Sequence, residues 1–533
     1  MNELLREIRS YVHFLFGLKG FFGSVLTLKE AEAIIRRRFQ EREKNFLSLV
    51  EKAIFRNPRS PYQPLLKMAG CEFGDLQRMV QSRGLEKTLD ELRKNDVYIT
   101  FEEFKGKKKI RRGGKIFEFQ PQDFDNPHLS HFYMAATGGS TGVGKRVPMD
   151  LDHLAAQTPN IMVAYHTYEI LEIPTALWMG ILPAPAGVNH ILRHAHFGHS
   201  PERWFTPVST GDMRFSPKNW LATKGIVGLG RLFGKAIPYP EKLPLERSSI
   251  LVQWAADKLR SNGKCQIRAG VSMSLRISLA ARRMGVDLTG VTFITGGEPL
   301  TRAKIQGIRE SGARVIPSYF FTETGVAGMG CAEPADENDI HFFDDLNAII
   351  QFPRPIHGSD VVIYPFYFTS LLPTAPKILL NVEIDDYGVI DRRSCGCGLE
   401  KYGYMTHLCG IRSFGKLTSE GVTLVGSEML RILEEVLPAR FGGSPLNFQL
   451  REVEDQSGFT RLHLIIDPEL HIPDEDAVIQ TLLGALERSS VSADYSKAIW
   501  EQAKTIQVVR EKPAWTERGK MPSLLSGRRN SSR

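Results

Sequence analysis

Between residues 132 and 382, short apolar runs alternate with amphipathic segments, and this alternation constrains the fold more than any other feature of the chain. Residues 290–294 (GVTFI) have the pattern of a buried strand, residues 302–311 that of a helix, and residues 313–316 (ARVI) that of the next strand. Repeated strand–helix–strand order is typical of α/β layers. We therefore expect the α/β fold class, with one large domain of layered sheets and helices.

The chain has 533 residues, enough for about two to four domains. Residues 1–105 are expected to form a helical segment packed on the main domain, and residues 106–414 the main domain itself. After residue 415 strands and helices mix, which predicts a smaller, mobile α+β domain over residues 415–533. The basic stretch 105–115 (KGKKKIRRGGK) is expected to be a solvated loop or hairpin that turns at Gly113 and Gly114.

Composition narrows the class of protein. The net charge of +8, from 68 basic and 60 acidic residues, is small for this length, and no recognition module is visible, so we expect no nucleic-acid partner. Six cysteines are too sparse for a disulfide scaffold and favour a reducing, cytoplasmic setting.

Near the N-terminus, residues 11–28 are rich in Phe and Leu, but Lys19 interrupts them and no cleavage site follows. A surface helix packed on the main domain is expected there. The alternative is a peripheral membrane contact through the same residues.

Residues 137–145 (TGGSTGVGK) are the sharpest local motif. Their glycines, hydroxyl side chains and lysine offer backbone N–H groups and side-chain donors that suit the phosphates of a nucleotide. A P-loop is a poor match, because Arg146 stands where Ser or Thr would hold Mg²⁺, and Val147 before Pro148 favours an extended chain rather than a helix. A turn without a ligand is the plainer alternative.

The segment closely resembles the phosphate loop of the superfamily of acyl-CoA synthetases, non-ribosomal adenylation domains and luciferases. That loop reads Thr/Ser-Ser/Gly-Gly-Ser/Thr-Thr-Gly-x-Pro-Lys, and only Gly144 departs from it, since the family has proline there. The resemblance implies a set of ATP-phosphate contacts, namely Thr137, Gly138, Gly139, Ser140, Thr141, Gly142 and Lys145.

Two further segments, 295–300 (TGGEPL) and 319–323 (YFFTE), follow in the order found in the family. Paired glycines allow close approach to a flat ring, an aromatic side chain can stack on adenine, and a carboxylate can hold Mg²⁺. The resemblance implies that Thr322 contacts the α-phosphate and that Glu323 holds Mg²⁺. It also implies a set of nucleotide contacts, namely Gly296, Gly297, Glu298, Pro299 and Tyr319. Phe320 replaces the glycine of the family, and the plainer alternative makes Tyr319 a core aromatic and Glu323 a helix cap.

The C-terminal third carries two more matches. In residues 383–388 (EIDDYG) the resemblance implies that Asp386 binds the ribose hydroxyls, with Asp385 as an alternative. In residues 410–413 (GIRS) it places Arg412 at the hinge between domains, and a plain surface arginine is the alternative. Residues 513–520 (PAWTERGK) resemble the Thr-x-x-Gly-Lys ending of the family, which implies that Lys520 reaches the reacting carboxylate and the α-phosphate.

Cysteine and histidine residues form a second constellation. Cys395 and Cys397 make a Cys-x-Cys pair flanked by glycines, and Cys331 and His341 lie upstream. Three thiolates and one imidazole are the ligand set of a closed structural Zn²⁺ site. Phenylacetate–CoA ligases look similar here, which narrows the resemblance to their branch. The alternatives are buried cysteines without a metal and Cys409 as a competing ligand.

The histidines His190, His194, His196 and His199 are expected to contact the acyl substrate rather than a metal, with His190 and His194 on one helix face. The aromatic-rich stretch 178–205 around them suggests an apolar pocket. These residues indicate an aryl or fatty class for the carboxylic acid substrate and do not identify it further.

Taken together, the resemblance implies an AMP-forming acid–thiol ligase. Such an enzyme activates a small-molecule carboxylic acid with Mg·ATP as an acyl-adenylate and transfers the acyl group to coenzyme A. Lys520, Glu323, Thr322 and Lys145 are the implied catalytic residues. Three alternatives stay open: an amine, hydroxyl or protein thiol as the acceptor, a zinc-stabilised binding protein of the same fold without catalysis, and a P-loop NTPase.

Overall fold

The computed structural model describes residues 2–129, 131–136, 146–182, 184–207, 217–336, 338–355, 362–413, 416–419, 422–425, 429, 431–487, 499–514 and 524–525. Of these, the side chains of residues at the outer ends of several elements, such as 2–12, are not described.

The first hundred residues are helical, as predicted. The helices are α1 (Asn2–Gly23), α2 (Leu28–Gln40), α3 (Arg42–Val50), η1 (Glu51–Phe55), α4 (Tyr62–Met68), α5 (Phe73–Arg83), α6 (Leu85–Lys94) and α7 (Phe101–Phe104). Thr27 begins α2 with a capping box, since its hydroxyl accepts from the Glu30 N–H and the Glu30 carboxylate accepts from the Thr27 N–H. The apolar faces of α3 to α6 share one core with the main sheet, where the Tyr62 hydroxyl donates to the Ile378 carbonyl over 2.9 Å.

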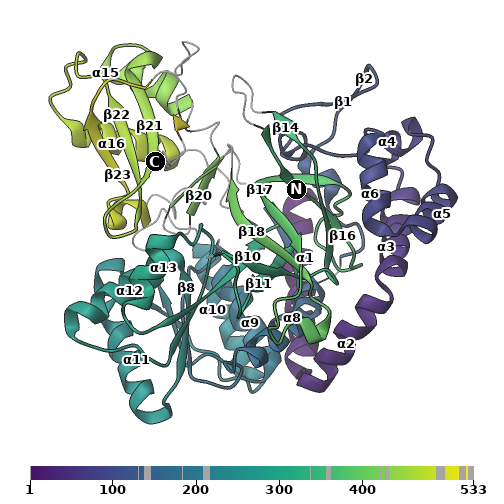
Figure 1. The fold of residues 1–533 in the computed structure, drawn as a ribbon, viewed down its shortest axis with the longest axis horizontal. Coiled ribbons are helices and arrows are strands. Elements are labelled where there is room, and N and C mark those ends of the chain that lie inside the picture. The colour runs from purple at the N-terminus through teal and green to yellow at the C-terminus, as the bar shows by residue number, and fades with distance from the viewer. Residues whose placement is uncertain are drawn as a thin grey trace.

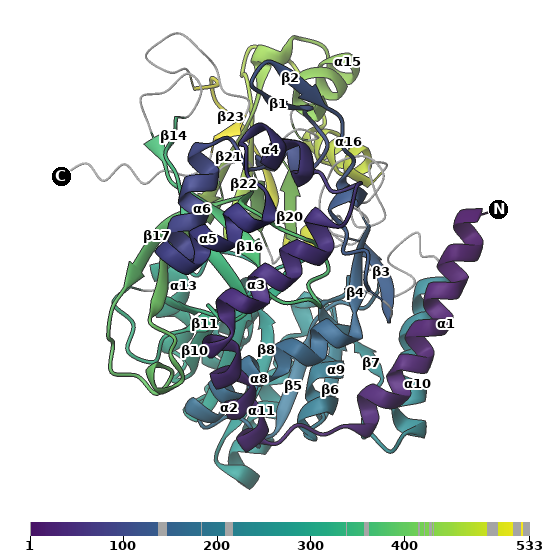
Figure 2. The ribbon, with the colours of Figure 1, turned by 90° about the vertical axis from the view of Figure 1, so that its right-hand side faces the viewer.

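The first helix lies along one edge of the molecule beside α10 (Pro217–Leu232), as Figure 2 shows. Phe14, Leu18 and Phe22 are buried in this contact, whereas Phe16 on the opposite face is 78% exposed. Among the described helices, none has the length and apolar character needed to cross a membrane.

A sheet of twelve described strands forms the centre of the molecule, in the order β13-β16-β17-β18-β12-β11-β10-β9-β8-β5-β6-β7 (Figure 1). Its parallel half comprises β5 (Thr175–Trp178), β6 (Arg203–Thr206), β7 (Pro240–Lys242), β8 (Cys265–Gly270), β9 (Val291–Gly296) and β10 (Arg314–Phe321). Its antiparallel half comprises β11 (Gly325–Gly330), β12 (Ile340–Phe342), β13 (Asn347–Gln351), β16 (Pro365–Ser370), β17 (Val382–Arg392) and β18 (Thr406–Ser413). Strand β10 belongs to both halves, because it pairs in parallel with β9 and antiparallel with β11.

The helices of the parallel half are α8 (Leu151–Thr167), α9 (Ala186–Phe197), α10, α11 (Ser249–Asn262), α12 (Val271–Met284) and α13 (Arg302–Arg309). The strands predicted near 290–294 and 313–316 correspond to β9 and β10, and the helix predicted between them is α13. Strands β8 and β9 are buried along their length because helices cover both faces of a parallel sheet. The predicted α/β fold class is therefore confirmed.

Among the described residues before 414, three hairpins lie outside the main sheet. In the first, β1 (Ile110–Arg112) and β2 (Lys115–Phe117) turn at Gly113 and Gly114, both at positive φ, as the sequence predicted. In the second, β3 (Phe132–Ala136) pairs with β4 (Arg146–Asp150), so a strand follows residues 137–145 where a P-loop would need a helix. The third joins β14 (Arg354–Pro355) to β15 (Val362–Ile363).

The C-terminal residues build a separate sheet in the order β23-β22-β21-β24 (Figure 1). Its strands are β21 (Phe448–Glu454), β22 (Thr460–Ile466), β23 (Ile506–Arg510) and β24 (Leu524–Leu525), with α15 (Leu437–Phe441), α16 (Glu475–Glu487) and the hairpin of β19 (Lys416–Ser419) and β20 (Val422–Val425). The β21–β22 turn of this sheet contacts helix α12 of the main domain, where the Arg276 guanidinium lies 4.5 Å from the Phe459 ring centroid.

Candidate active site

Three segments far apart in the sequence meet at Asp386. Tyr319 on β10 donates a hydrogen bond from its hydroxyl to Oδ2 of Asp386 on β17 over 2.9 Å. Ser413, at the end of β18, donates to the other carboxylate oxygen. Asp386 is opposite Ser413 in the β17–β18 register, and Tyr319 is buried against Phe321 and Phe368. Burial and the neighbouring Asp386 carboxylate raise the pKa of the Tyr319 phenol well above its usual value.

Glu323 lies in the turn between β10 and β11 and forms an ion pair with Lys105. The Glu323 side chain is 10% exposed and the Lys105 ammonium reaches it from the end of α7. Thr322 precedes it in the same turn. The basic stretch predicted to be solvated therefore directs its first lysine to the carboxylate that the sequence assigned to Mg²⁺. In this position Glu323 is not a helix cap.

At the end of β9, Gly296 is closely enclosed. A Cβ atom built there would lie 2.6 Å from the Phe320 ring and 2.9 Å from Oγ of Ser318, so only glycine fits without displacing a neighbour. Gly297 has a φ of 85°, which also favours glycine. Gly296 therefore lies beside the β10 strand that carries Tyr319. Pro299 follows them in the same connection.

Glu298 is held by protein groups. It accepts hydrogen bonds from the backbone N–H and the hydroxyl of Ser272, each over 2.7 Å, and from the Lys304 ammonium over 3.1 Å. Lys304 also donates to Oγ1 of Thr460, on the C-terminal sheet, over 2.9 Å. The side chains of Glu298 and Lys304 are fully buried. Lys304 thus links Glu298 in the main domain to the C-terminal sheet.

Arg412 is exposed on β18 opposite Tyr387, and its Nη1 donates to the Ile411 carbonyl over 3.0 Å. Asp385 beside Asp386 is buried at a φ of 77°, an unusual backbone conformation for a residue with a side chain. The phosphate-loop residues 137–145, the hinge residues Phe414 and Gly415, and Lys520 lie outside the described residues. Their predicted roles remain predictions.

The four residues assigned to zinc come together. Ligand atoms of Cys331, His341, Cys395 and Cys397 all lie within 4.8 Å of one another. Nε2 of His341 is 3.0 Å from Sγ of Cys397 and 3.5 Å from Sγ of Cys395. The cluster joins the end of β11 and strand β12 to the β17–β18 connection.

The surroundings of this cluster suit a tetrahedral metal ion. Nδ1 of His341 lies 2.9 Å from the Tyr404 carbonyl, which places the proton on Nδ1 and leaves the Nε2 lone pair for a ligand. Backbone N–H groups donate to the sulfur atoms of all three cysteines, over 3.3 Å to Cys331 and 3.4 Å to Cys395 and Cys397. A hydrogen bond from the Cys331 thiol lowers the pKa of Cys397 far below its usual value, which favours a thiolate.

The competing ligand Cys409 is not part of this cluster. A second group, Cys331, Asp339 and His407, also lies within reach of a metal. Asp339, however, already pairs with Arg393, and its Oδ1 lies 2.7 Å from Nδ1 of His407. The Cys₃His set is therefore the better metal site.

Of the histidines, His190 and His194 lie on α9, and both are buried together with Arg193. Burial lowers the pKa of His194 to about 3, so its imidazole is neutral. Neither histidine belongs to a metal-capable cluster of the described residues. The aromatic residues expected to line a pocket are instead in the apolar cores, with Trp178 and Trp204 fully buried.

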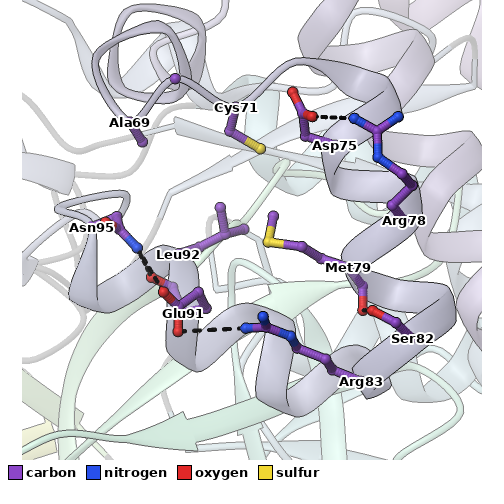
Figure 3. Close-up of a pocket in the computed structure, with 11 residues that line it drawn as sticks. Ala69, Cys71, Asp75, Arg78, Met79, Ser82, Arg83, Glu91, Leu92 and Asn95 are labelled. Carbon is purple, nitrogen blue, oxygen red and sulfur yellow. Dashed lines mark hydrogen bonds and ion pairs between the residues drawn. The ribbon is translucent and has the colours of Figure 1, made fainter.

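A hollow of about 410 Å³ lies among the N-terminal helices, lined by α5 and α6 (Figure 3). Ion pairs between Arg78 and Asp75 and between Arg83 and Glu91 occupy its rim. None of its lining residues belongs to the motifs above, and we assign it no ligand.

Sequence reasoning missed several contacts at the site. Lys105 was quoted only as part of a basic loop, and Ser413 only as the last residue of a motif. Neither has a local signal, because both meet their partners through sheet pairing and helix packing. Arg193 and Arg268, considered below, were not singled out at all.

No protein-family model matches the chain, and no curated protein matches its sequence. The structure, in contrast, has the fold of a solved CoA ligase. One solved neighbour is a 2-hydroxyisobutyryl-CoA ligase in complex with 2-HIB-AMP and CoA in the thioesterification state. It is 13% identical, with a TM-score of 0.54 over 95% of this chain and 91% of that chain.

Two other solved structures are similar more loosely. The same ligase in the post-adenylation state is 12% identical, with a TM-score of 0.45 over 94% of this chain and 90% of that chain. An anthranilate CoA ligase in complex with anthranoyl-AMP is 13% identical, with a TM-score of 0.31 over 82% and 75%. The likeness to the first of these structures confirms the predicted fold. The phenylacetate–CoA ligase branch stays a prediction.

Proposed function

We propose that this protein is an AMP-forming ligase that activates a carboxylic acid with Mg·ATP and transfers the acyl group to coenzyme A. One observation carries the proposal. Tyr319 and Ser413, from two separate motifs, both donate to the carboxylate of Asp386, which belongs to a third. Tyr319 and Asp386 are the positions at which the resemblance implies contacts to adenine and to ribose. The fold supports the same assignment.

The residues at the site fit a nucleotide. Asp386 is acceptor-only when ionised, so ribose hydroxyls can replace the hydroxyls of Tyr319 and Ser413 that it now accepts. The enclosed Gly296 packs against Ser318 and Phe320, the two neighbours of Tyr319 on β10. Glu323 would hold Mg²⁺, which neutralises phosphate charge, once the Lys105 ammonium turns from its carboxylate toward the phosphates.

The proposed reaction has two steps. A carboxylate oxygen of the acid attacks the α-phosphorus of ATP, a P–O bond forms, and pyrophosphate leaves. The thiol sulfur of coenzyme A then attacks the acyl carbon, the thiol proton is lost, and AMP leaves. Lys145 and Lys520 supply positive charge to the phosphates and the reacting centre, Thr322 contacts the α-phosphate, and residues 415–533 rotate between the steps.

We assign the acid to an aryl or fatty class, as the sequence predicts. We assign the enzyme to a reducing, cytoplasmic compartment, and the six free cysteines support this compartment. We also assign Zn²⁺ to Cys331, His341, Cys395 and Cys397. The close sulfur and nitrogen atoms and the N–H groups directed at the sulfurs support a closed structural site. The metal there would tie the β11–β12 and β17–β18 connections together.

Exchange of labelled pyrophosphate into ATP tests the proposal, with a panel of aryl and fatty acids added one at a time. We expect exchange that depends on both the acid and Mg²⁺, and an acyl-CoA product when coenzyme A is added. Phosphate release without any acid would indicate an NTPase instead. A folded protein that shows no exchange with any acid would favour the binding-protein alternative, and product with an amine but not with coenzyme A would change the acceptor.

A further inference from the structure

Two arginine side chains are buried side by side under the candidate active site. Arg268 extends from the middle of the parallel half of the sheet, on β8, and Arg193 from α9, which covers that face. Each is 4% exposed. Arg268 donates to His190, which lies one turn before Arg193 on α9, so the two guanidinium groups are close together. Burial, and then the charge of Arg268, lower the pKa of Arg193 to about 9.

The hydrogen-bond partners of these two groups are neutral. Nε of Arg268 donates to Nε2 of His190 over 2.6 Å, and its Nη2 donates to Oγ of Ser318 over 3.1 Å. Nη2 of Arg193 donates to Oε1 of Gln157 over 2.6 Å, and Nε of Arg193 has no partner among the described residues. Within the described part of the chain, no Asp or Glu pairs with either guanidinium.

Such an arrangement is costly without an anion. Removing a charged group from water costs several kcal/mol, and buried charges in proteins are normally paired. The buried arginine Arg112 shows the ordinary solution in this molecule, since two of its nitrogen atoms bond both carboxylate oxygens of Glu103. Within the described residues, Arg193 and Arg268 have no such carboxylate partner. His190 and His194 beside them carry no charge, because burial keeps both imidazoles neutral.

Both arginines lie one side chain away from the nucleotide motifs. Ser318, which accepts from Arg268, is the residue whose Oγ would lie 2.9 Å from a Cβ on Gly296. Gln157, which accepts from Arg193, donates in turn to the carbonyl of Thr324, next to Glu323. A ligand anion here would therefore border the place where the acid meets ATP.

We infer that Arg193 and Arg268 form the anion subsite of the acid substrate, so that a carboxylate of the acid lies against the two guanidinium groups. This inference rests on the proposed function and deepens it. A guanidinium presents paired N–H donors that match the two oxygens of a carboxylate. The carboxylate can be the reacting one, held before it attacks ATP, or a second acid group on the acyl part, and the experiment separates the two.

The test compares the acid affinity of the wild-type protein with that of Arg268→Met, Arg193→Met and Arg268→Lys. Acids are supplied as matched pairs, benzoate with terephthalate and octanoate with octanedioate, and KM values for acid and for ATP are taken from pyrophosphate exchange. We expect each Met variant to raise the KM of the acid about 10- to 100-fold, the range for loss of a charged hydrogen bond, with the KM of ATP within about twofold of wild type. Arg268→Lys keeps the positive charge but lacks the paired N–H donors of a guanidinium. Its KM for the acid should lie between those of wild type and Arg268→Met.

The pairs identify the source of the carboxylate. If wild type prefers the dicarboxylic member and Arg268→Met abolishes that preference, the subsite holds a second acid group. If wild type shows no preference, Arg268→Met should raise the KM of both members of a pair equally. It should still form thioester from a preformed acyl-adenylate, because the adenylate has no free carboxylate. Either pattern supports the subsite.

Other results would overturn the inference while leaving the proposed function intact. An unchanged KM of the acid in the folded Met variants would overturn it. Equal losses of affinity for the acid, for ATP and for the preformed adenylate would overturn it as well. Arg112→Met is the matched control, because it removes a buried arginine whose charge Glu103 already compensates, and should leave the acid KM unchanged. Exchange that is absent in wild type with every acid would instead reject the proposed function itself.

Discussion

The hydroxyl group of Tyr319 lies 2.9 Å from Oδ2 of Asp386, although 67 residues separate the two in the sequence. The antiparallel half of the sheet brings them together, since Tyr319 lies near the end of the shared strand β10 and Asp386 lies on β17. Ser413 completes the contact from β18. The relationship places the Asp386 carboxylate beside the aromatic ring of Tyr319.

Replacing this carboxylate tests whether it holds ribose. Asp386→Asn should raise the KM of ATP in pyrophosphate exchange about 10- to 100-fold, because one amide nitrogen cannot accept from a ribose hydroxyl. The KM of the acid should change little. Asp391→Asn is a suitable control, since Asp391 lies on the same strand with a half-exposed side chain. Equal effects of the two changes would contradict the assignment.

The cysteine cluster should contain one zinc ion per chain. Metal analysis of the purified protein should find about one equivalent, and Cys395→Ser should reduce it and lower the thermal midpoint, because one ligand of a closed site is lost. Cys71→Ser, which changes a buried cysteine outside the cluster, should leave the metal content unchanged. Undiminished metal in Cys395→Ser would rule out this ligand set.

The buried pair of Glu298 and Lys304 predicts strong coupling. Lys304→Met should lower the free energy of unfolding by about 3–5 kcal/mol, because it leaves Glu298 buried without its cation. The double variant with Glu298→Gln should recover much of that loss, as measured by denaturant unfolding. The exposed pair of Arg282 and Glu310 provides the control, and Arg282→Met should cost less than about 1 kcal/mol. Additive effects at the buried pair would show that the two do not interact.

His153 predicts how stability depends on pH. Burial lowers its pKa from 6.5 to about 4, and the ring stays close to the Thr324 carbonyl. Below pH 6.5 the unfolded chain binds a proton that the folded chain does not, so this contribution is complete above pH 6.5 and falls by about 3 kcal/mol toward pH 4. The stability difference between wild type and His153→Gln should therefore shrink over that range. A difference that is constant from pH 7 to pH 4.5 would contradict the assigned shift.

The edge formed by α1 and α10 should bind anionic membranes. Residues 8–29 and 213–240 contain no Asp or Glu but eight Lys and Arg, an excess equal to the net charge of the whole chain. On this edge Phe16, Leu221 and Leu232 are 78%, 60% and 76% exposed. Apolar side chains among cations favour the surface of an anionic bilayer.

Co-sedimentation with phosphatidylserine–phosphatidylcholine vesicles should exceed that with phosphatidylcholine alone, and Phe16→Glu should reduce it severalfold. Val389→Glu, a change of an equally apolar side chain that is 60% exposed on β17, should have no effect. Binding that is absent, or insensitive to Phe16→Glu, would reject the contact.

Local features of the chain could be predicted from the sequence because they depend on near neighbours. The strand–helix alternation predicted β9, α13 and β10, and the paired glycines predicted the β1–β2 turn, since periodicity and φ preferences act within a few residues. The chemistry of the Cys₃His set was also visible, because glycine-flanked cysteines have few other uses, and the structure brings those four residues together.

Only the tertiary structure decided which charges meet. Three contacts join residues from different elements. Lys105 pairs with Glu323, Lys304 bonds both Glu298 and Thr460, and Arg193 lies beside Arg268. An isolated charged residue has no periodic signal, and its partner is set by strand order and helix packing. For that reason the sequence by itself determined the kinds of layers and the available chemistry, whereas the packing of those layers determined where the charges lie and which remain for a ligand.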